Sequence, residues 1–391
     1  GGDATPGRES LIGTGGGLED GSPGGKEGCH GMASRASELG LLPDLARVGQ
    51  FVDASAFKAK AQALARLENG FRDEYMCVRR QAEGAEGYAD RITESTAQVR
   101  ACNRYSDIVC LEDTRVHLET QVEHDYINAS WIRVEGLKSI QYIAAQAPLP
   151  KTFESFWRMV WEYDVPLVLM LTPWQEHAHG RTRIKADPYF PQEPGTSETH
   201  GDFKITCEDL DLTNHAQGLD VRRLQLKNNH RDAARAPIRT VYHVHFTHWP
   251  DFGSVRDLGS YLNMHATVRR WEETARGATA STAGAASDSQ DPHEESTTST
   301  LKQSAAPTAQ FKAPTVNHCS AGIGRTGTFI AIDAVLRWIT DRVNEASDSP
   351  AKLNLADIVK QLRNQRPGMV VTLDQYVMLY QVIYYALFGS S

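Results

Sequence analysis

The sequence predicts an α/β layer architecture, because stretches with strand and helix character alternate along the chain and are joined by long connections. Residues 126–132 alternate as a strand does, and residues 142–145 form the next short strand. Residues 165–171 are a continuous apolar run, which suits a strand covered on both faces. Between these last two, residues 153–162 have the composition of a helix.

Further elements flank this region on both sides. Residues 56–82 favour a helix, with Gly70 as its weak point. Residues 241–246 alternate again, and apolar residues at helical spacing begin at Leu258. A short strand then precedes a glycine-rich segment, and a helix with an apolar face follows Gly327.

Two segments are expected to be disordered, 1–40 and about 274–312, while 41–391 is expected to be one folded domain. Residues 1–40 hold 13 of the 31 glycines and have no apolar periodicity. Residues 278–310 contain 12 Ser and Thr and 8 Ala, with Leu301 as their only larger aliphatic residue. Neither segment buries enough apolar surface to offset the entropy of ordering it.

Composition narrows the class of protein. The chain has 391 residues, 41 Lys and Arg and 49 Asp and Glu, giving a net charge of −8. This balance argues against nucleic acid as the main partner. The six scattered cysteines form neither a disulfide framework nor a zinc motif. This pattern favours a reducing compartment, so we expect the protein in the cytoplasm and also in the nucleus. No apolar run is long enough to span a membrane, and we expect a monomer.

The segment 318–327, HCSAGIGRTG, carries the chemistry. Its glycines let several backbone N–H groups point at one spot, and the following helix begins there, so the segment can hold an anion. Arg325 can bind a phosphate with two parallel hydrogen bonds, and the same positive charge favours a thiolate at Cys319. A nucleotide-binding loop would need Lys before Thr326, which is absent; a glycine-rich turn with a buried cysteine remains the plain alternative.

These residues resemble the signature of the cysteine-dependent, phosphotyrosine-specific protein tyrosine phosphatases, HCSAGxGR[ST]G. The resemblance implies a highly twisted mixed central sheet flanked by helices (an α+β variant of the α/β class), and a catalytic domain of the non-receptor type over 41–391. It implies no metal and no cofactor. Five further family blocks occur in the chain, namely NRYxD at 103–107, DYINAS at 125–130, QAPL at 146–149, WPDxG at 249–253 and RPGM at 366–369.

The resemblance assigns roles in a two-step reaction on phosphotyrosine-containing proteins. Cys319 would attack phosphorus, and Asp251 would protonate the leaving tyrosine and then activate water. Thr326 would stabilise the thiolate when it leaves. The phosphoryl oxygens would be bound by the Arg325 side chain and by the backbone N–H groups of Ser320, Ala321, Gly322, Ile323, Gly324 and Arg325.

Five more residues match supporting positions of the family. Tyr105 would stack on the substrate ring and set the pocket depth, and Asp107 would hold the substrate backbone. His318 would orient the loop from beneath. Glu176 would brace Arg325, and Lys185 would pair with the acid; extra residues between these two depart from the family's spacing.

Other departures carry predictions of their own. Val371 stands where family members commonly have the glutamine that orients the hydrolytic water, so this role would fall to Gln375, and a kinetic burst is expected. Cys102 replaces a lysine and removes one positive charge from the pocket rim. Deleting the insert at 274–312 should leave activity largely intact.

Three other functions are consistent with parts of the sequence. Val371 is compatible with a catalytically dead phosphotyrosine-binding module, although Cys319, Asp251 and Arg325 are all present. A dual-specificity or lipid phosphatase would share the cysteine signature, although Tyr105 favours the tyrosine-specific type. A thiol redox protein would need a second cysteine, and none is adjacent to Cys319.

Overall fold

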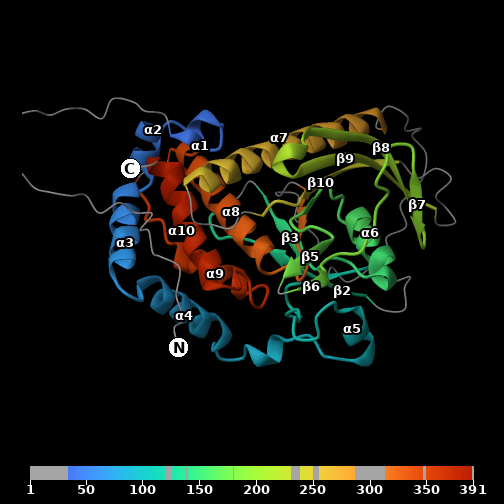
Figure 1. The fold of residues 1–391 in the computed structure, drawn as a ribbon, viewed down its shortest axis with the longest axis horizontal. Coiled ribbons are helices and arrows are strands. Elements are labelled where there is room, and N and C mark those ends of the chain that lie inside the picture. Colours follow the sequence, from blue (N-terminus) through green and yellow to red (C-terminus); the bar gives the residue numbers. More distant parts are fainter. Residues whose placement is uncertain are drawn as a thin grey trace, which may run out of the picture.

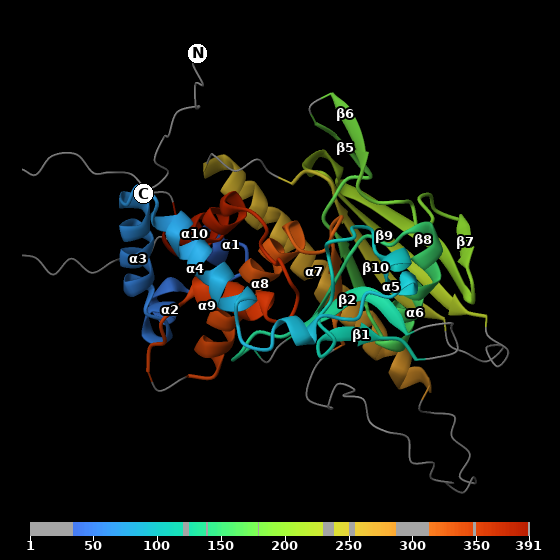
Figure 2. The same ribbon diagram turned by 90° about the horizontal axis from the view of Figure 1, so that it is seen from below.

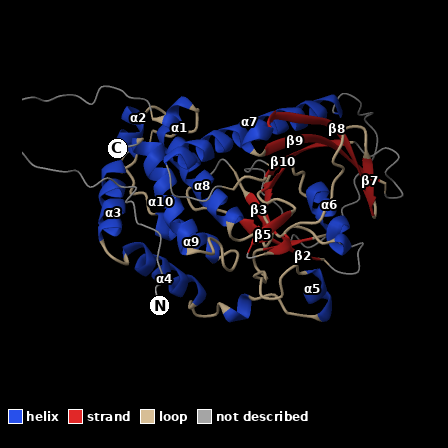
Figure 3. Cartoon of the chain, in the orientation of Figure 1, coloured by secondary structure: helices blue, strands red, loops and turns tan. Residues whose placement is uncertain are grey.

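The structure is a computed structural model that describes residues 34–119, 125–137, 140–178, 180–229, 238–249, 255–286, 313–346 and 349–389. Its helices, shown in Figures 1 and 3, are α1 Arg35–Glu38, α2 Leu45–Phe51, α3 Ala54–Arg66, α4 Gly70–Glu83, α5 Ala97–Cys102, α6 Phe153–Glu162, α7 Val255–Ala286, α8 Arg325–Asn344, α9 Leu355–Arg363 and α10 Leu373–Phe388. Its strands are β1 Arg115–His117, β2 Tyr126–Ile132, β3 Tyr142–Ala145, β4 Leu167–Met170, β5 Gln175–Ala178, β6 Arg181–Ile184, β7 Ser197–His200, β8 Phe203–Asn214, β9 Leu219–Asn228, β10 Arg239–Phe246 and β11 Thr315–His318.

Nine strands form one mixed sheet in the order β1-β2-β3-β11-β4-β10-β9-β8-β7. The neighbours β3, β11, β4 and β10 are parallel to one another, and the outer pairs are antiparallel. The predicted class, a mixed central sheet flanked by helices, is therefore confirmed. Because β11 lies in the parallel centre, its carboxyl end opens at the edge where an α/β sheet presents its ligand site.

Both faces of the central strands β3, β11 and β4 are buried, and alternate residues of β4 show which cluster covers each face. Leu167 and Leu169 belong to the larger apolar cluster, which includes residues of α7, α8, α9 and α10. Val168 and Met170 belong to a second cluster with α6. The helices therefore cover opposite faces, as Figure 1 shows for α6 and for the α8–α10 group. This explains why 165–171 lacks polar alternation.

The helical regions differ from expectation in three places. The helix predicted over 56–82 is two helices, α3 and α4, which separate near Gly70; a Cβ at this glycine would lie 2.3 Å from the Leu64 carbonyl oxygen. Helix α1 lies within 1–40, the segment that was expected to be disordered. The Ser34 side chain caps this helix, and its Ala36 side chain is fully buried. Helix α7 runs to residue 286 and so enters 274–312, where alanine favours helix.

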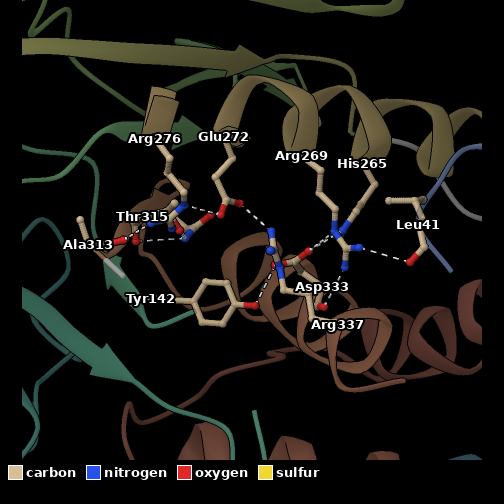
Figure 4. A network of polar contacts seen from close by, with 11 residues as sticks. Leu41, Tyr142, His265, Arg269, Glu272, Arg276, Ala313, Thr315, Asp333 and Arg337 are labelled. Atoms are coloured by element: carbon tan, nitrogen blue, oxygen red, sulfur yellow. Dashed lines mark hydrogen bonds and ion pairs between the residues drawn. The ribbon is translucent and has the colours of Figure 1, made fainter. Parts of the chain in front are cut away.

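A buried network of charges joins α7 to α8 (Figure 4). The Asp333 carboxylate of α8 accepts hydrogen bonds from His265 Nε2 at 2.8 Å and from Arg269 Nε at 3.0 Å, both in α7. It also accepts from Arg337 Nε and from the Tyr142 hydroxyl, each at 2.7 Å. Helix α7 follows the WPDxG segment closely and α8 begins at the signature arginine, so the network fixes two helices that adjoin catalytic segments.

Candidate active site

The signature segment turns between the end of β11 and the start of α8. The turn requires glycine at Gly322, which has a φ of +72° and whose Cβ would lie 2.0 Å from the Ala145 carbonyl oxygen. The Ala147 N–H donates to the Ser320 carbonyl at 2.9 Å and ties the turn to the segment after β3. The segment 319–325 is called the phosphate loop below.

The buried Arg366 guanidinium holds the phosphate loop from beneath. Its Nε donates to the Gly322 carbonyl at 2.9 Å and its Nη2 to the Ala321 carbonyl at 3.1 Å. Its Nη2 also donates to Asn128 Oδ1 at 2.6 Å. With the carbonyls turned toward Arg366, the loop's N–H groups are free to face the opposite side. In the sequence this arginine is marked only as part of the RPGM block, which does not reveal its role.

Cys319 lies at the base of this loop and is 6% exposed. Burial alone would raise the pKa of its thiol, but hydrogen bonds from the Thr326 side chain and from the backbone N–H groups of Thr326 and Gly322 outweigh burial, and the charge of Arg325 adds to them. The resulting pKa is lower than that of an ordinary cysteine. Among the described residues the Thr326 hydroxyl has no nitrogen or oxygen partner, so it is free to turn toward the sulfur.

A chain of buried polar groups sets the protonation of His318. Its Nδ1 lies 3.0 Å from the Cys319 carbonyl oxygen, which only accepts, so Nδ1 carries the proton. Burial lowers the pKa of His318 to about 3, so the ring is neutral and Nε2 accepts from the Tyr189 hydroxyl at 2.6 Å. That hydroxyl in turn accepts from His243 Nε2 at 2.7 Å. His318 therefore contacts the loop backbone through Nδ1, and no pattern in the sequence links Tyr189 or His243 to it.

The structure brings Glu176, Lys185 and Arg325 together. Glu176 Oε1 lies 2.6 Å from Arg325 Nη2, and Oε2 lies 3.0 Å from Lys185 Nζ. Burial would raise the pKa of Glu176, but its contacts with Lys185 and Arg325 lower it below the usual value, so the carboxylate stays charged. One oxygen of the carboxylate thus contacts the arginine, although the spacing between Glu176 and Lys185 is longer than in the family. These contacts come from β5 and from the residue after β6.

Tyr105 lies at the edge of the phosphate loop. The Ser320 hydroxyl donates to the Lys185 carbonyl at 2.7 Å, so it accepts from the Tyr105 hydroxyl at 2.7 Å. Asp107 is exposed on the same segment. The segment is anchored by Arg104, whose Nη2 lies 2.6 Å from Asp187 Oδ2. Tyr105 is thus held beside the loop at a position from which a ring can line the entrance.

Gln375 approaches the phosphate loop from the start of α10. A Cβ at Gly324 would lie 3.0 Å from Gln375 Nε2, so the amide is close to the loop backbone. Gln375 Oε1 accepts from the Val371 N–H at 2.9 Å, which orients the amide nitrogen. Val371 itself is 42% exposed. The amide of Gln375 therefore lies near the loop. Val371, at the position where family members commonly have the glutamine that orients water, is apolar.

Asp251, the predicted general acid, lies outside the described residues. Trp249, which precedes it by two positions, is described and is half-buried, with its ring 6.0 Å from that of Tyr261 in α7. Cys102 is 7% exposed and ends α5, so its side chain is buried. Within the described part of the chain, none of the helices has the length and apolar character needed to cross a membrane.

Comparison with known proteins agrees with this geometry. Tyrosine-protein phosphatase 3 of Dictyostelium discoideum is 34% identical over 287 residues, which is 72% of this chain and 24% of that protein. Human receptor-type tyrosine-protein phosphatase eta is 31% identical over 350 residues, 85% of this chain and 22% of that protein. Human tyrosine-protein phosphatase non-receptor type 9 is 30% identical over 323 residues, 82% of this chain and 46% of that protein.

The chain thus spans less than half the length of each of these relatives, which include receptor and non-receptor types. The similarity to the family extends well beyond the signature segment 318–327. Residues 100–385 match the protein-tyrosine phosphatase family, and this range contains the sheet, the phosphate loop and the residues gathered around it. By fold, site and sequence, the chain is a member of the protein-tyrosine phosphatase family.

Proposed function

We propose that the chain hydrolyses phosphotyrosine in proteins through a cysteinyl-phosphate intermediate. The observation that carries this proposal is the placement of Cys319 at the base of the phosphate loop, where the N–H groups of Gly322 and Thr326 and the charge of Arg325 lower the pKa of its thiol. A thiolate is the reactive form of cysteine, and at this place it faces the position where the loop's N–H groups converge.

In the first step, the Cys319 thiolate forms a bond to phosphorus while the bond from phosphorus to the tyrosine oxygen breaks. Asp251 gives its proton to that oxygen, because a phenolate is a poor leaving group. Charge on the three transferring oxygens is stabilised by loop N–H groups and by Arg325, which Glu176 holds in place.

In the second step, water attacks phosphorus and the bond from sulfur to phosphorus breaks. Asp251, now a carboxylate, accepts the proton of the water, and inorganic phosphate leaves. The Thr326 hydroxyl stabilises the thiolate that forms, and the amide of Gln375 is close enough to the loop to help position the water. The Cys319 thiolate and the Asp251 carboxylic acid are thereby restored.

Tyr105 supports a preference for phosphotyrosine over phosphoserine. Its hydroxyl is fixed on Ser320, so its ring forms a wall beside the loop. The sulfur is almost fully buried, and a substrate must therefore reach into the site to meet it. The longer phosphotyrosine side chain spans that depth, whereas phosphoserine is too short.

The test is turnover of a phosphotyrosyl peptide, with the same sequence carrying phosphothreonine as control. We expect turnover of the first peptide alone, and its loss in Cys319→Ser. Turnover of both peptides would indicate a dual-specificity enzyme, and binding without turnover would indicate a phosphotyrosine-binding module. Capture of phosphoproteins by Asp251→Ala would then identify substrates and test action in the cytoplasm and nucleus.

A further inference from the structure

The hairpin β5–β6 projects from the rest of the described chain (Figure 2). Its base is fixed to the phosphate loop at two points. Glu176 pairs with Arg325 at 2.6 Å, and the Ser320 hydroxyl donates to the Lys185 carbonyl at 2.7 Å. The position of the hairpin relative to a bound phosphate is therefore set by the catalytic loop itself.

The strand register places two arginines on one face of this hairpin. Glu176 is directly opposite Arg183, and the next pair on that face is Ala178 opposite Arg181. Opposed residues in an antiparallel pair share a face, and so do alternate residues along a strand. Arg181 and Arg183 therefore lie on the face from which Glu176 reaches the catalytic arginine, and all of β6 is exposed.

The positive charge of these arginines is not neutralised by the hairpin. Glu176 is its only acidic residue, and each of its oxygens is already in an ion pair, Oε1 with Arg325 and Oε2 with Lys185. Within the described part of the chain, no carboxylate lies at ion-pair distance from Arg181 or Arg183. A local positive surface thus stands beside the site of a chain whose net charge is −8.

The Tyr105 segment, which also contacts Ser320, carries charge of the other sign. Tyr105 approaches the phosphate loop through Ser320, and Asp107, two residues later, is an exposed acid. Ser320 thus contacts both the Tyr105 segment and the base of the hairpin. An acidic residue near the phosphotyrosine of a substrate is therefore repelled on the Asp107 side and attracted on the hairpin side.

We propose that Arg181 and Arg183 form a basic subsite that binds carboxylate side chains close to the phosphotyrosine of the substrate. This inference rests on the proposed function. An extended peptide advances about 3.3 Å per residue, so residues one to three positions from the phosphotyrosine lie about 3–10 Å along the hairpin. Two exposed charge pairs correspond to a preference of about threefold to tenfold, which falls as salt increases.

The experiment compares two phosphotyrosyl peptides that differ only in having Glu or Gln at the three positions on each side. We expect the full chain to show a higher kcat/KM for the Glu peptide at low salt and a smaller difference at high salt. The variant Arg181→Gln/Arg183→Gln should lose this preference. The matched control, Arg47→Gln/Arg72→Gln, removes the same charge from exposed positions on α2 and α4 and should retain it.

Equal kcat/KM for the two peptides at low salt, or a preference that survives in the hairpin variant, would overturn the subsite. Turnover of p-nitrophenyl phosphate by every variant reports whether the catalytic site is intact. If the wild type turns over no phosphate ester, the proposed function fails, and affinity of the peptides for Cys319→Ser still decides the subsite. Tighter binding of the Glu peptide that depends on Arg181 and Arg183 supports it, and equal binding contradicts it.

Discussion

Two buried cysteines in different parts of the sheet have opposite properties. Cys207 lies in β8, in the antiparallel half, and is fully buried. Burial raises the pKa of its thiol, and the charge of Arg222 lowers it too little to compensate. Cys319 is almost as buried, yet the pKa of its thiol is lowered.

The difference lies in the groups that surround each sulfur. Around Cys207, strand N–H groups are used in the ladder with β9, and its Sγ has a carbonyl for a neighbour, Asp209 O at 3.6 Å. Around Cys319, a loop and a helix start supply N–H donors, a hydroxyl and a guanidinium. Burial alone therefore makes a cysteine inert, and donors fixed in advance make a buried cysteine reactive.

The largest expected effect comes from replacing the Cys319 sulfur with oxygen, and the same replacement at Cys207 is its control. Cys319→Ser should lower turnover of an aryl phosphate by at least about 10⁴-fold, because an alcohol remains protonated where the thiol does not. Cys207→Ser, with turnover expressed per folded molecule, should stay near the wild type. Comparable losses in both variants would break the comparison, since the second sulfur would then have a role beyond packing.

The same principle applies to a buried carboxylate. Burial would raise the pKa of Asp333, but Arg337, Arg269 and His265 hold it well below the usual value. Asp333→Asn should lower the free energy of unfolding at pH 7 by about 3–5 kcal/mol, because it removes the carboxylate that pairs with Arg269 and leaves Arg337 paired with Glu272 alone. The folded pKa is depressed, so this stabilisation is present above the unfolded pKa of about 3.9 and is lost as pH falls toward the folded pKa.

Urea unfolding at pH 7 and near pH 3 measures this effect. The difference between wild type and Asp333→Asn should shrink at the lower pH. Asp73→Asn, at an exposed position in the first turn of α4, is the matched control and should differ little from the wild type at either pH. A difference that is constant with pH would mean that the Asp333 charge is not the source of the stabilisation.

The sequence was most informative where the chemistry is local. The phosphate loop and the start of α8 lie in one short segment, so residue types alone predict an anion site with a nucleophile. Strands β2, β3, β4 and β10 and helix α6 were predicted from periodicity and apolar runs, close to their observed bounds. These signals come from residues that are neighbours along the chain, so a single sequence is enough to reveal them.

The groups that support the loop come from distant positions. Tyr189 is 129 residues from His318, and Arg366 is 44 residues from Gly322. A buried tyrosine or arginine has no spacing that reveals its partner, and only the packing of the sheet brings them together. The end of α7 shows the reverse error, since composition suggested disorder where alanines continue a helix already begun.

A smaller effect is expected from removing one of the hydrogen-bond donors that surround the Cys319 sulfur. Thr326→Ala removes the hydroxyl beside the sulfur, and a hydrogen bond to a charged group contributes about 1.5–3 kcal/mol. The midpoint of the pH dependence of Cys319 alkylation by iodoacetate should therefore rise by about one to two pH units. Thr326→Ser keeps the hydroxyl and should keep the midpoint. An unchanged midpoint in Thr326→Ala would assign the lowered thiol pKa to the backbone N–H groups and Arg325 alone.

The smallest expected effect concerns the second step, where the low pKa of Cys319 makes the thiolate a good leaving group. Positioning of water then limits hydrolysis of the phosphoenzyme, and Val371 offers it no hydrogen bond. Val371→Gln adds a polar group at an exposed position near Gln375, and one neutral hydrogen bond corresponds to an acceleration of about 2–10-fold. In stopped-flow measurements the wild type should show a burst that Val371→Gln reduces and the apolar control Val371→Leu retains. A wild type without a burst at any pH would mean that the slow step comes before phosphoenzyme hydrolysis. Positioning of water would then not limit the release of the Cys319 thiolate.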